Sequence, residues 1–262
     1  MIKRTWYITC LLIFIFLSCS INIKTVKDNT LNETIITILS NPRFPQEIKE
    51  NILKETAESQ NFINELQIIM MQDPYLYLLV DKNHPLDKDY NPKDLVTLKK
   101  GSYSVNREAM ELRSAAAASL EEMADAAKND NITLLVISAY RSYSSQNTIY
   151  TNYVRTIGQI AADRASAKPG HSQHQLGFTA DFGLLNNRFA QTAEGIWLYN
   201  NASRFGWSLS YPDGYEEITG YQWESWHYRY VGKELAEFIN KYFNGIQQYA
   251  LEFIHNMHNI TN

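Results

Sequence analysis

Side chains that can bind a metal gather in one glycine-rich stretch of the chain, residues 169–183. The stretch contains His171, His174 and Asp181, and no other part of the sequence has metal-binding side chains at this density. Imidazole nitrogens and carboxylate oxygens are the usual ligands of a catalytic zinc ion, which takes three protein ligands and keeps one position open. The stretch therefore offers part of a hydrolytic metal site.

A second cluster, residues 223–230, supplies what the first lacks. His174 and Asp181 do not fit one helix face neatly, whereas a loop that leads into a strand can bring both to one point. His227 would complete the ligand set from a different strand. We predict that His174, Asp181 and His227 bind Zn²⁺, and that His171, the competing ligand, lies at the rim of the site or behind the ligands.

Two further residues can supply the chemistry of hydrolysis. Glu224 shortly precedes His227 and is the natural general base for a water molecule activated by the metal, with a solvated turn glutamate as the alternative. Arg141 follows a predicted buried strand, where its guanidinium could bind a carboxylate or stabilise an oxyanion. A surface arginine is the other interpretation. The aromatic residues of the second cluster shape a pocket or simply belong to the core.

The elements around these residues predict an α+β fold, with a small antiparallel sheet carrying the zinc site and helices on its sides. Apolar periodicity, capping residues and turn signals give the following expectations. Helices are expected over 45–71, over 107–128 with Asn106 as its cap, over 144–156 and over 194–205, and again after Gly232; strands are expected over 75–80, 132–137 and 207–211.

The N-terminus resembles an export signal. Lys3 and Arg4 precede a short apolar run that is too short to span a bilayer comfortably, and the run ends before Cys19 in a pattern similar to a lipoprotein signal. We expect a signal peptide over 1–19, with an ordinary cleaved signal or an uncleaved anchor as the alternatives. A tether and helical extension (20–70), a catalytic domain that carries the zinc site (71–245) and a C-terminal helix or tail (246–262) would follow. The protein is then exported to the periplasm or cell envelope, with membrane association through this N-terminal lipid or anchor.

Composition narrows the function classes. The chain has 262 residues, 45% hydrophobic and 20% charged, with a net charge of −4 and no long basic run, so nucleic acid is a poor candidate partner. Its two cysteines, Cys10 and Cys19, both fall in the leader, so the exported part has no disulfide. The remaining histidines, His84, His255 and His258, are predicted to lie on the surface.

Three motifs together resemble those of the VanY/LdcB-type zinc D-alanyl-D-alanine carboxypeptidase family. They are Ser138-Ala139-Tyr140-Arg141-Ser142, Ser172-x-His174-x-x-Gly177-x-Thr179-x-Asp181 and Glu224-x-Trp226-His227-x-Arg229-Tyr230-Val231-Gly232. The resemblance extends from about residue 75 to about residue 235. Departures from the family pattern occur at Thr179, Ser210 and Ser225, none of which is a predicted ligand.

The resemblance implies a function and a role for each site residue. Zinc ligation by His174, Asp181 and His227, catalysis by Glu224 and Arg141, and contacts of Gln146 and Ser172 with the terminal D-alanine are its implications. The implied reaction removes the C-terminal D-alanine from peptidoglycan stem peptides. The alternatives are an L,D-carboxypeptidase that acts on tetrapeptide stems and a non-catalytic zinc-fold protein that binds the cell wall.

Overall fold

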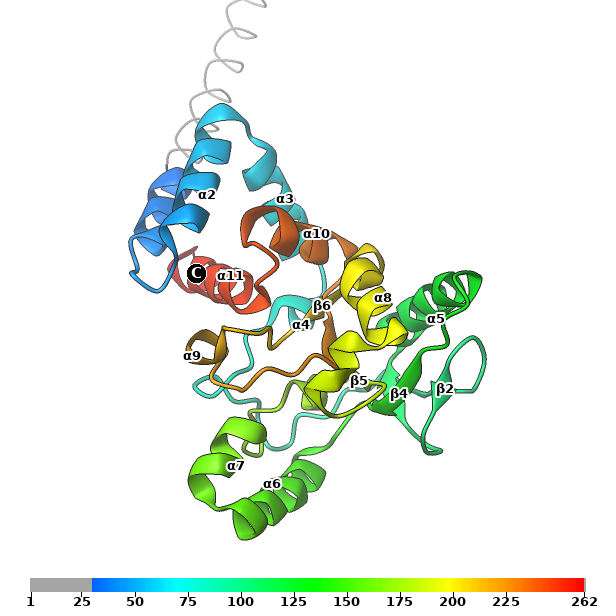
Figure 1. The fold of residues 1–262 in the computed structure, drawn as a ribbon. Coiled ribbons are helices and arrows are strands. Elements are labelled where there is room, and N and C mark those ends of the chain that lie inside the picture. The colour runs from blue at the N-terminus through cyan, green and yellow to red at the C-terminus, as the bar shows by residue number, and fades with distance from the viewer. Residues whose placement is uncertain (1–29, 262) are drawn as a thin grey trace, which may run out of the picture.

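The computed structural model describes residues 30–261 and has the α+β architecture that the sequence predicted. A small sheet lies at the centre with helices on several sides (Figure 1). Its strands follow the order β2-β4-β5-β7-β6, and every neighbouring pair except β2–β4 is antiparallel. They are β2 (Ser104–Val105), β4 (Leu135–Ser138), β5 (Thr179–Phe182), β6 (Trp207–Leu209) and β7 (His227–Tyr230). A separate antiparallel pair joins β1 (Leu95–Thr97) and β3 (Glu111–Arg113).

The register of the inner strands places polar side chains in one row. Ala180 of β5 and Tyr228 of β7 belong to the hydrophobic core, so the residues next to them in sequence, which alternate across the strand, face the other way. Asp181 is paired with His227 on one side and with Ser138 on the other. The sheet therefore carries Ser138, Asp181 and His227 side by side on three neighbouring strands.

A hydrophobic core fills the space between the sheet and the helices that cover its opposite face. The alanine-rich α5 contributes Leu120, Met123 and Ala124, and α8 contributes Leu198. Small alanine side chains let α5 approach the sheet closely, because they occupy little volume. The covering elements are α5 (Ser114–Asn129), α8 (Ala193–Asn201) and the 3₁₀ turns η2 (Asn187–Gln191) and η3 (Ala202–Phe205), and Leu176 of the 3₁₀ turn η1 (Gln173–Leu176) adds to the same core.

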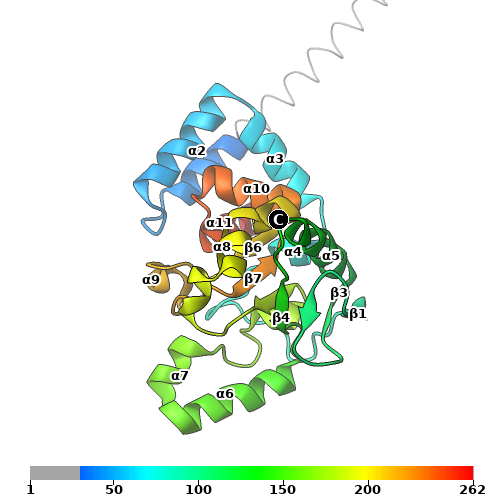
Figure 2. The same cartoon turned by 45° about the vertical axis from the view of Figure 1, so that its right-hand side comes forward.

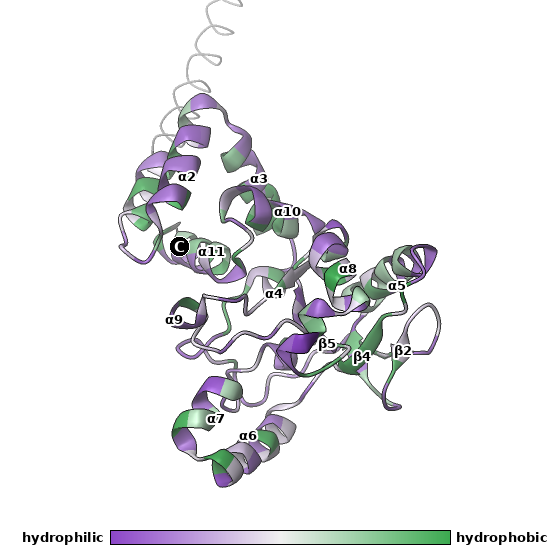
Figure 3. Ribbon diagram, in the orientation of Figure 1, coloured by the Kyte–Doolittle hydropathy of each residue, from purple (hydrophilic) through white to green (hydrophobic). Residues whose placement is uncertain are grey.

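A second core joins the two ends of the described chain. Residues 30–39 are helical and pack with four helices that Figures 1 and 2 both show close together. These are α2 (Gln46–Glu58), α3 (Asn61–Met70), α10 (Lys233–Tyr242) and α11 (Gln247–Thr261). In Figure 3 the outer side of α2 is mostly hydrophilic, whereas α11 carries many hydrophobic residues. Burial of these apolar faces against one another holds the C-terminal helix in place.

Two helices stand apart from both cores. α6 (Tyr143–Ile157) and α7 (Gln159–Ala165) project from the end of the molecule opposite α2 and α3 (Figure 2). The Ser142 hydroxyl accepts a hydrogen bond from the Ser145 N–H and so caps α6. Gln146 is the one residue of α6 that is buried. Two short helical turns, α4 (Pro74–Tyr77) and α9 (Glu216–Thr219), complete the described elements.

Three predicted elements differ in the structure. Residues 75–80 do not form a strand, because the Asp73 carboxylate accepts a hydrogen bond from the Tyr75 N–H and Pro74 follows it, which starts the helical turn α4. The helix predicted over 107–128 begins only at Ser114, since Ala109 has a left-handed φ of 57° and β3 comes next. The helix predicted over 45–71 is split into α2 and α3 by an extended Ser59.

Within the predicted tether and helical extension (20–70), residues 30–39 already form a helix. Ile35, Ile38 and Leu39 from this helix are buried in the second core. The predicted signal peptide with Cys19, and the rest of the tether, lie outside the described residues. Within residues 30–261, no helix combines the length and apolar character needed to cross a bilayer. The domain boundaries at residues 70 and 245 stay predictions.

Candidate metal centre and active site

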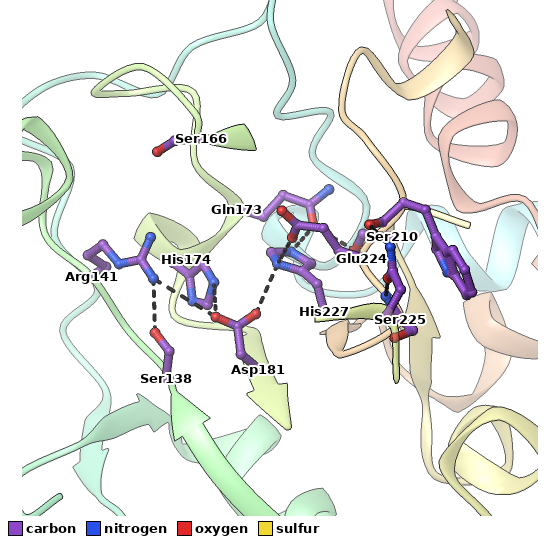
Figure 4. Close-up of polar contacts among 12 residues, drawn as sticks. Ser138, Arg141, Ser166, Gln173, His174, Asp181, Ser210, Glu224, Ser225 and His227 are labelled. Atoms are coloured by element: carbon purple, nitrogen blue, oxygen red, sulfur yellow. Dashed lines mark hydrogen bonds and ion pairs between the residues drawn. The ribbon is translucent and has the colours of Figure 1, made fainter. Parts of the chain in front are cut away.

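The structure brings the three predicted metal ligands to one buried point. Asp181 lies between the two histidines: its Oδ2 atom is 3.2 Å from His174 Nε2, and its Oδ1 atom is 3.1 Å from His227 Nδ1 (Figure 4). His174 comes from η1, and Gly177 ends this turn with a left-handed φ of 76°, which glycine adopts without strain. Within residues 30–261 these three side chains form the one group whose ligand atoms suit a metal, all within 4.8 Å of one another.

Hydrogen bonds on the far side of each imidazole leave a lone pair facing the centre. His174 Nδ1 lies 2.7 Å from the carbonyl oxygen of Ala139, which can only accept, so this nitrogen carries the proton. His227 Nε2 lies 3.3 Å from the side-chain oxygen of Gln173. This oxygen can also only accept, so His227 Nε2 donates the hydrogen bond. His174 Nε2 and His227 Nδ1 are therefore free to bind a cation, as in metal sites where the second ring nitrogen is held by a carbonyl.

The charges of the ligands also fit a divalent cation. Burial lowers the pKa of His174 to about 4, so this imidazole is neutral near neutral pH. Burial by itself would raise the pKa of Asp181, but the two histidines outweigh it and hold that pKa well below its usual range. Asp181 Oδ1 is buried with no hydrogen-bond donor aligned on it. One buried carboxylate and two imidazoles whose ring nitrogens converge on one point are a ligand set that can bind zinc.

Glu224 stands beside the ligands without belonging to them. Its Oε2 atom is 3.4 Å from His227 Nδ1, and its side chain is 13% exposed. A turn places it there, since the Glu224 N–H bonds to the Tyr211 carbonyl and the His227 N–H bonds back to the Glu224 carbonyl. Burial, and then repulsion from Asp181, raises the pKa of Glu224 well above its ordinary value. A carboxylate with a raised pKa holds a proton more readily, as a general base near neutral pH requires.

Arg141 reaches the centre from the strand end at β4. Its guanidinium donates to the Ser138 hydroxyl at 2.9 Å and to the Gln146 side-chain oxygen at 2.7 Å, and it lies 4.0 Å from Asp181 Oδ2. Burial lowers the pKa of Arg141, and the attraction of Asp181 and Glu224 opposes this shift. The group stays charged, because an arginine starts from a pKa above 12. It is a fixed cation at the edge of the metal centre and not a surface arginine.

These groups surround one pocket of about 200 Å³. Gln146 and Ser172, the predicted substrate contacts, both line it. The Gln146 amide is already engaged, since its nitrogen donates to the Ala167 carbonyl at 2.6 Å while its oxygen accepts from Arg141. In this state Gln146 holds the arginine in place, so its predicted contact with substrate remains a prediction. The other lining residues include Tyr153, Tyr211, Gln222 and Trp226.

The other histidines lie away from the ligand group. His171 Nδ1 is 2.8 Å from the Asp81 carbonyl oxygen, and His171 is not part of the ligand group. His84 and His255 do not simply face solvent as predicted: their rings pack against each other with centroids 4.8 Å apart, and His84 Nδ1 lies 2.8 Å from the Asp81 carboxylate. His258 is exposed.

Sequence reasoning missed the residues that hold the ligands and the arginine. Ser138 belongs to the first family motif without a predicted role, although it ends the strand that delivers Arg141. Gln173 lies between Ser172 and His174, and nothing in its spacing distinguishes it. Ser210 was noted as a departure from the family pattern; it donates a hydrogen bond to Gln173 at 2.7 Å. The contacts of Gln173 join residues far apart in the chain, so sequence spacing carried little sign of them.

Comparison with known proteins agrees with this geometry. Residues 109–233 match the family model described as VanY: D-alanyl-D-alanine carboxypeptidase. YodJ of Bacillus subtilis (strain 168) is 38% identical over 196 residues, which are 70% of this chain and 71% of YodJ. The structure of the LdcB LD-carboxypeptidase is similar with a TM-score of 0.63 and 36% identity, covering 69% of this chain and 88% of LdcB. The structure of a variant of the D,D-pentapeptidase VanY from a VanB-type resistance cassette, solved with Zn(II), is similar with a TM-score of 0.57 and 29% identity. The match covers 68% of this chain and 99% of that VanY chain. By its sequence, its fold and its His-Asp-His centre, the chain belongs to the VanY family of D-alanyl-D-alanine carboxypeptidases.

Proposed function

We propose that this protein is a zinc-dependent carboxypeptidase that removes the C-terminal D-alanine from peptidoglycan stem peptides. The observation that carries the proposal is the arrangement of Glu224 and Arg141 on either side of the His174, Asp181 and His227 centre, all facing one pocket. The family of the chain supports the D-alanyl-D-alanine end of the substrate.

His174, Asp181 and His227 would hold zinc, which would supply a Lewis acid for the scissile carbonyl and for a water molecule. Glu224 then takes the proton from the attacking water, and it is suited to this because burial has raised its pKa. The same carboxyl returns the proton to the amine of the departing D-alanine. Since Glu224 is only 13% exposed, bulk water does not compete strongly for this proton.

Arg141 supplies the preference for a chain end. A guanidinium held by Ser138 and Gln146 can offer its remaining N–H groups to the terminal carboxylate of the substrate, or to the oxyanion that forms during attack. An internal peptide bond has no such carboxylate. This arrangement therefore favours removal of single residues from the C-terminus over cleavage within a chain.

An L,D-carboxypeptidase acting on tetrapeptide stems is the second candidate. The similarity to the LdcB LD-carboxypeptidase, which exceeds that to VanY in both identity and TM-score, favours it. A non-catalytic protein that binds the cell wall is less well supported, because Glu224 and Arg141 both line the pocket.

The test compares two substrates with the same zinc-loaded protein. Stem pentapeptides ending in D-alanyl-D-alanine and stem tetrapeptides are incubated separately, and mass analysis follows the loss of one alanine from each. We expect faster loss from the pentapeptide. Faster loss from the tetrapeptide would establish the L,D activity instead, and no loss from either would reject both enzymatic proposals.

We also propose that the protein is exported and held at the cell envelope by its N-terminus. The charged start, the apolar run and Cys19 support this proposal. The test is mass analysis of the N-terminus of protein extracted from membranes. A lipid on Cys19 supports the anchor, whereas an unmodified N-terminus in a soluble fraction contradicts it.

A further inference from the structure

A buried chain of hydrogen bonds leads from the metal ligand His227 to the C-terminal helix. His227 Nε2 meets the side-chain oxygen of Gln173, and the Gln173 side-chain nitrogen donates to the side-chain oxygen of Gln247 at 3.3 Å (Figure 4 shows the His227 end). The Gln247 nitrogen in turn donates to the carbonyl oxygen of Ser208 at 3.2 Å. Gln173 and Gln247 are 2% and 1% exposed, so water does not replace these bonds.

The donors and acceptors of this series of hydrogen bonds are fixed by the backbone carbonyl of Ser208. The carbonyl of Ser208 can only accept, so the nitrogen of Gln247 must face it and the oxygen of Gln247 must face Gln173. An oxygen at that position requires the nitrogen of Gln173, which turns the oxygen of Gln173 towards His227. That oxygen accepts the His227 Nε2 proton and leaves Nδ1 with its lone pair towards Asp181.

Ser210 supports the same orientation. Its hydroxyl donates to the Gln173 oxygen at 2.7 Å, and its backbone N–H bonds to the His227 carbonyl at 3.1 Å. A flipped Gln173 amide would turn its NH₂ group towards His227 Nε2 and its oxygen towards the oxygen of Gln247. With the NH₂ group facing His227, the Nε2 proton has no acceptor. With the oxygen facing Gln247, two acceptors lie next to each other without a proton between them. The buried surroundings make both changes unfavourable.

Gln247 is held in position by forces that do not involve the metal centre. It is the first residue of α11, and the turn before this helix has left-handed φ values at Asn244 (54°) and Gly245 (76°). Further along α11, Phe253 and Ile254 are fully buried in the second core. The position of Gln247 is therefore set by packing of the C-terminal helix, beyond the residues 109–233 that match the family model.

We infer that Gln247 is a positioning residue for the zinc centre: through Gln173 it fixes the tautomer and the ring orientation of His227. The inference rests on the proposed function for its purpose, because a preset His227 lone pair is needed to bind zinc for hydrolysis. In this protein the C-terminal helix thus completes the metal site.

The test uses Gln247→Met, which keeps the volume of the side chain and removes its hydrogen bonds with Gln173, Ser208 and Ser210. Zinc affinity is measured by competition with a chelator, and nitrogen NMR of the zinc-free protein reports which nitrogen of His227 carries the proton. We expect about ten-fold weaker zinc binding, the lower end of the loss seen when partners of metal-binding histidines are removed. We also expect a mixture of tautomers in place of the Nε2-protonated form.

Gln248→Met is the matched control. Gln248 is the next residue of α11, is 4% exposed, and bonds to Asp81 and Glu252 instead of Gln173. We expect it to lose stability and keep the zinc affinity and the His227 tautomer of the wild type. Ser210→Ala, a small change with little risk to folding, should shift the tautomer in the same direction as Gln247→Met.

The inference is overturned if Gln247→Met binds zinc within about two-fold of the wild-type affinity and keeps the wild-type tautomer of His227. If Gln247→Met does not fold, an unchanged tautomer in Ser210→Ala overturns it. Neither readout needs turnover. A protein that releases no D-alanine but shows these shifts would refute the proposed function alone, and an active protein without them would refute the inference alone.

Discussion

Replacement of Glu224 by glutamine separates the chemistry of the site from its metal binding. The amide keeps the shape of the side chain but cannot take a proton from water. General bases of this kind contribute about 10²- to 10⁴-fold to a rate, or about 2.7 to 5.4 kcal/mol of the barrier at 1.36 kcal/mol for each factor of ten. We expect kcat to fall by that factor.

Zinc should remain bound in the same variant. The ligand atoms of His174, Asp181 and His227 lie within 4.8 Å of one another without any contribution from Glu224. The zinc-free variant should also melt at a higher temperature than the wild type, because a carboxyl group whose pKa is raised by burial and by Asp181 destabilises the folded state.

The assay measures release of D-alanine at matched zinc content, with metal analysis of each preparation. Glu217→Gln is the control, because Glu217 is an exposed residue of the same segment and should leave the rate unchanged. A Glu224→Gln enzyme that holds zinc and turns over within about ten-fold of the wild type would refute the assignment of the base.

Three further changes follow from the structure. Arg141→Lys should keep zinc and lower kcat/KM by about 10²- to 10³-fold, with a loss of discrimination against substrates whose terminal carboxylate is amidated; retained discrimination would contradict the role of the guanidinium. His174→Ala should weaken zinc binding by more than about 100-fold and remove the rise in Tm that zinc gives the wild type, and an unchanged rise would contradict its role as a ligand. Burial raises the pKa of Glu194 to about 7, while its carboxylate accepts a hydrogen bond from the Leu135 N–H at 2.7 Å. The folded state therefore holds a proton more tightly than the unfolded state, and stability falls as pH rises from about 4.5 to about 7. Glu194→Gln should gain about 2 kcal/mol relative to wild type across this window, after allowance for partial exposure, whereas a constant difference in unfolding free energy would contradict the shift.

The metal centre could be predicted because the types of its residues indicate metal binding. Histidine and aspartate at the end of a glycine-rich loop, with a second histidine in an aromatic strand, have few other interpretations in combination. The strand before Arg141 and the helix after it were also accessible, since apolar runs and capping residues are local signals. The structure places Asp181 opposite His227 by strand register, which agrees with what local pattern suggested.

Other features depended on partners far away in the chain. Residues 75–80 have strand-like composition, but Arg229 is fully buried and donates to the carbonyls of Tyr75, Leu76 and Leu78, which stabilises a non-strand path. The spacing of Ile35, Ile38 and Leu39 is typical of a helix, but the polar residues around them weaken this signal in the sequence. In the structure these three side chains pack in one core with residues of α11, which stabilises the helix. The hydrogen bonds between Gln173 and Gln247 leave no trace in local sequence.

The most direct test of the whole account is removal and return of the metal with the wild-type protein and a stem pentapeptide. Treatment with a chelator should abolish release of D-alanine, and one equivalent of Zn²⁺ per chain should restore it, with the product shorter by a single alanine. Release that continues in the metal-free protein, or a zinc-loaded protein that leaves the pentapeptide intact, would contradict the account.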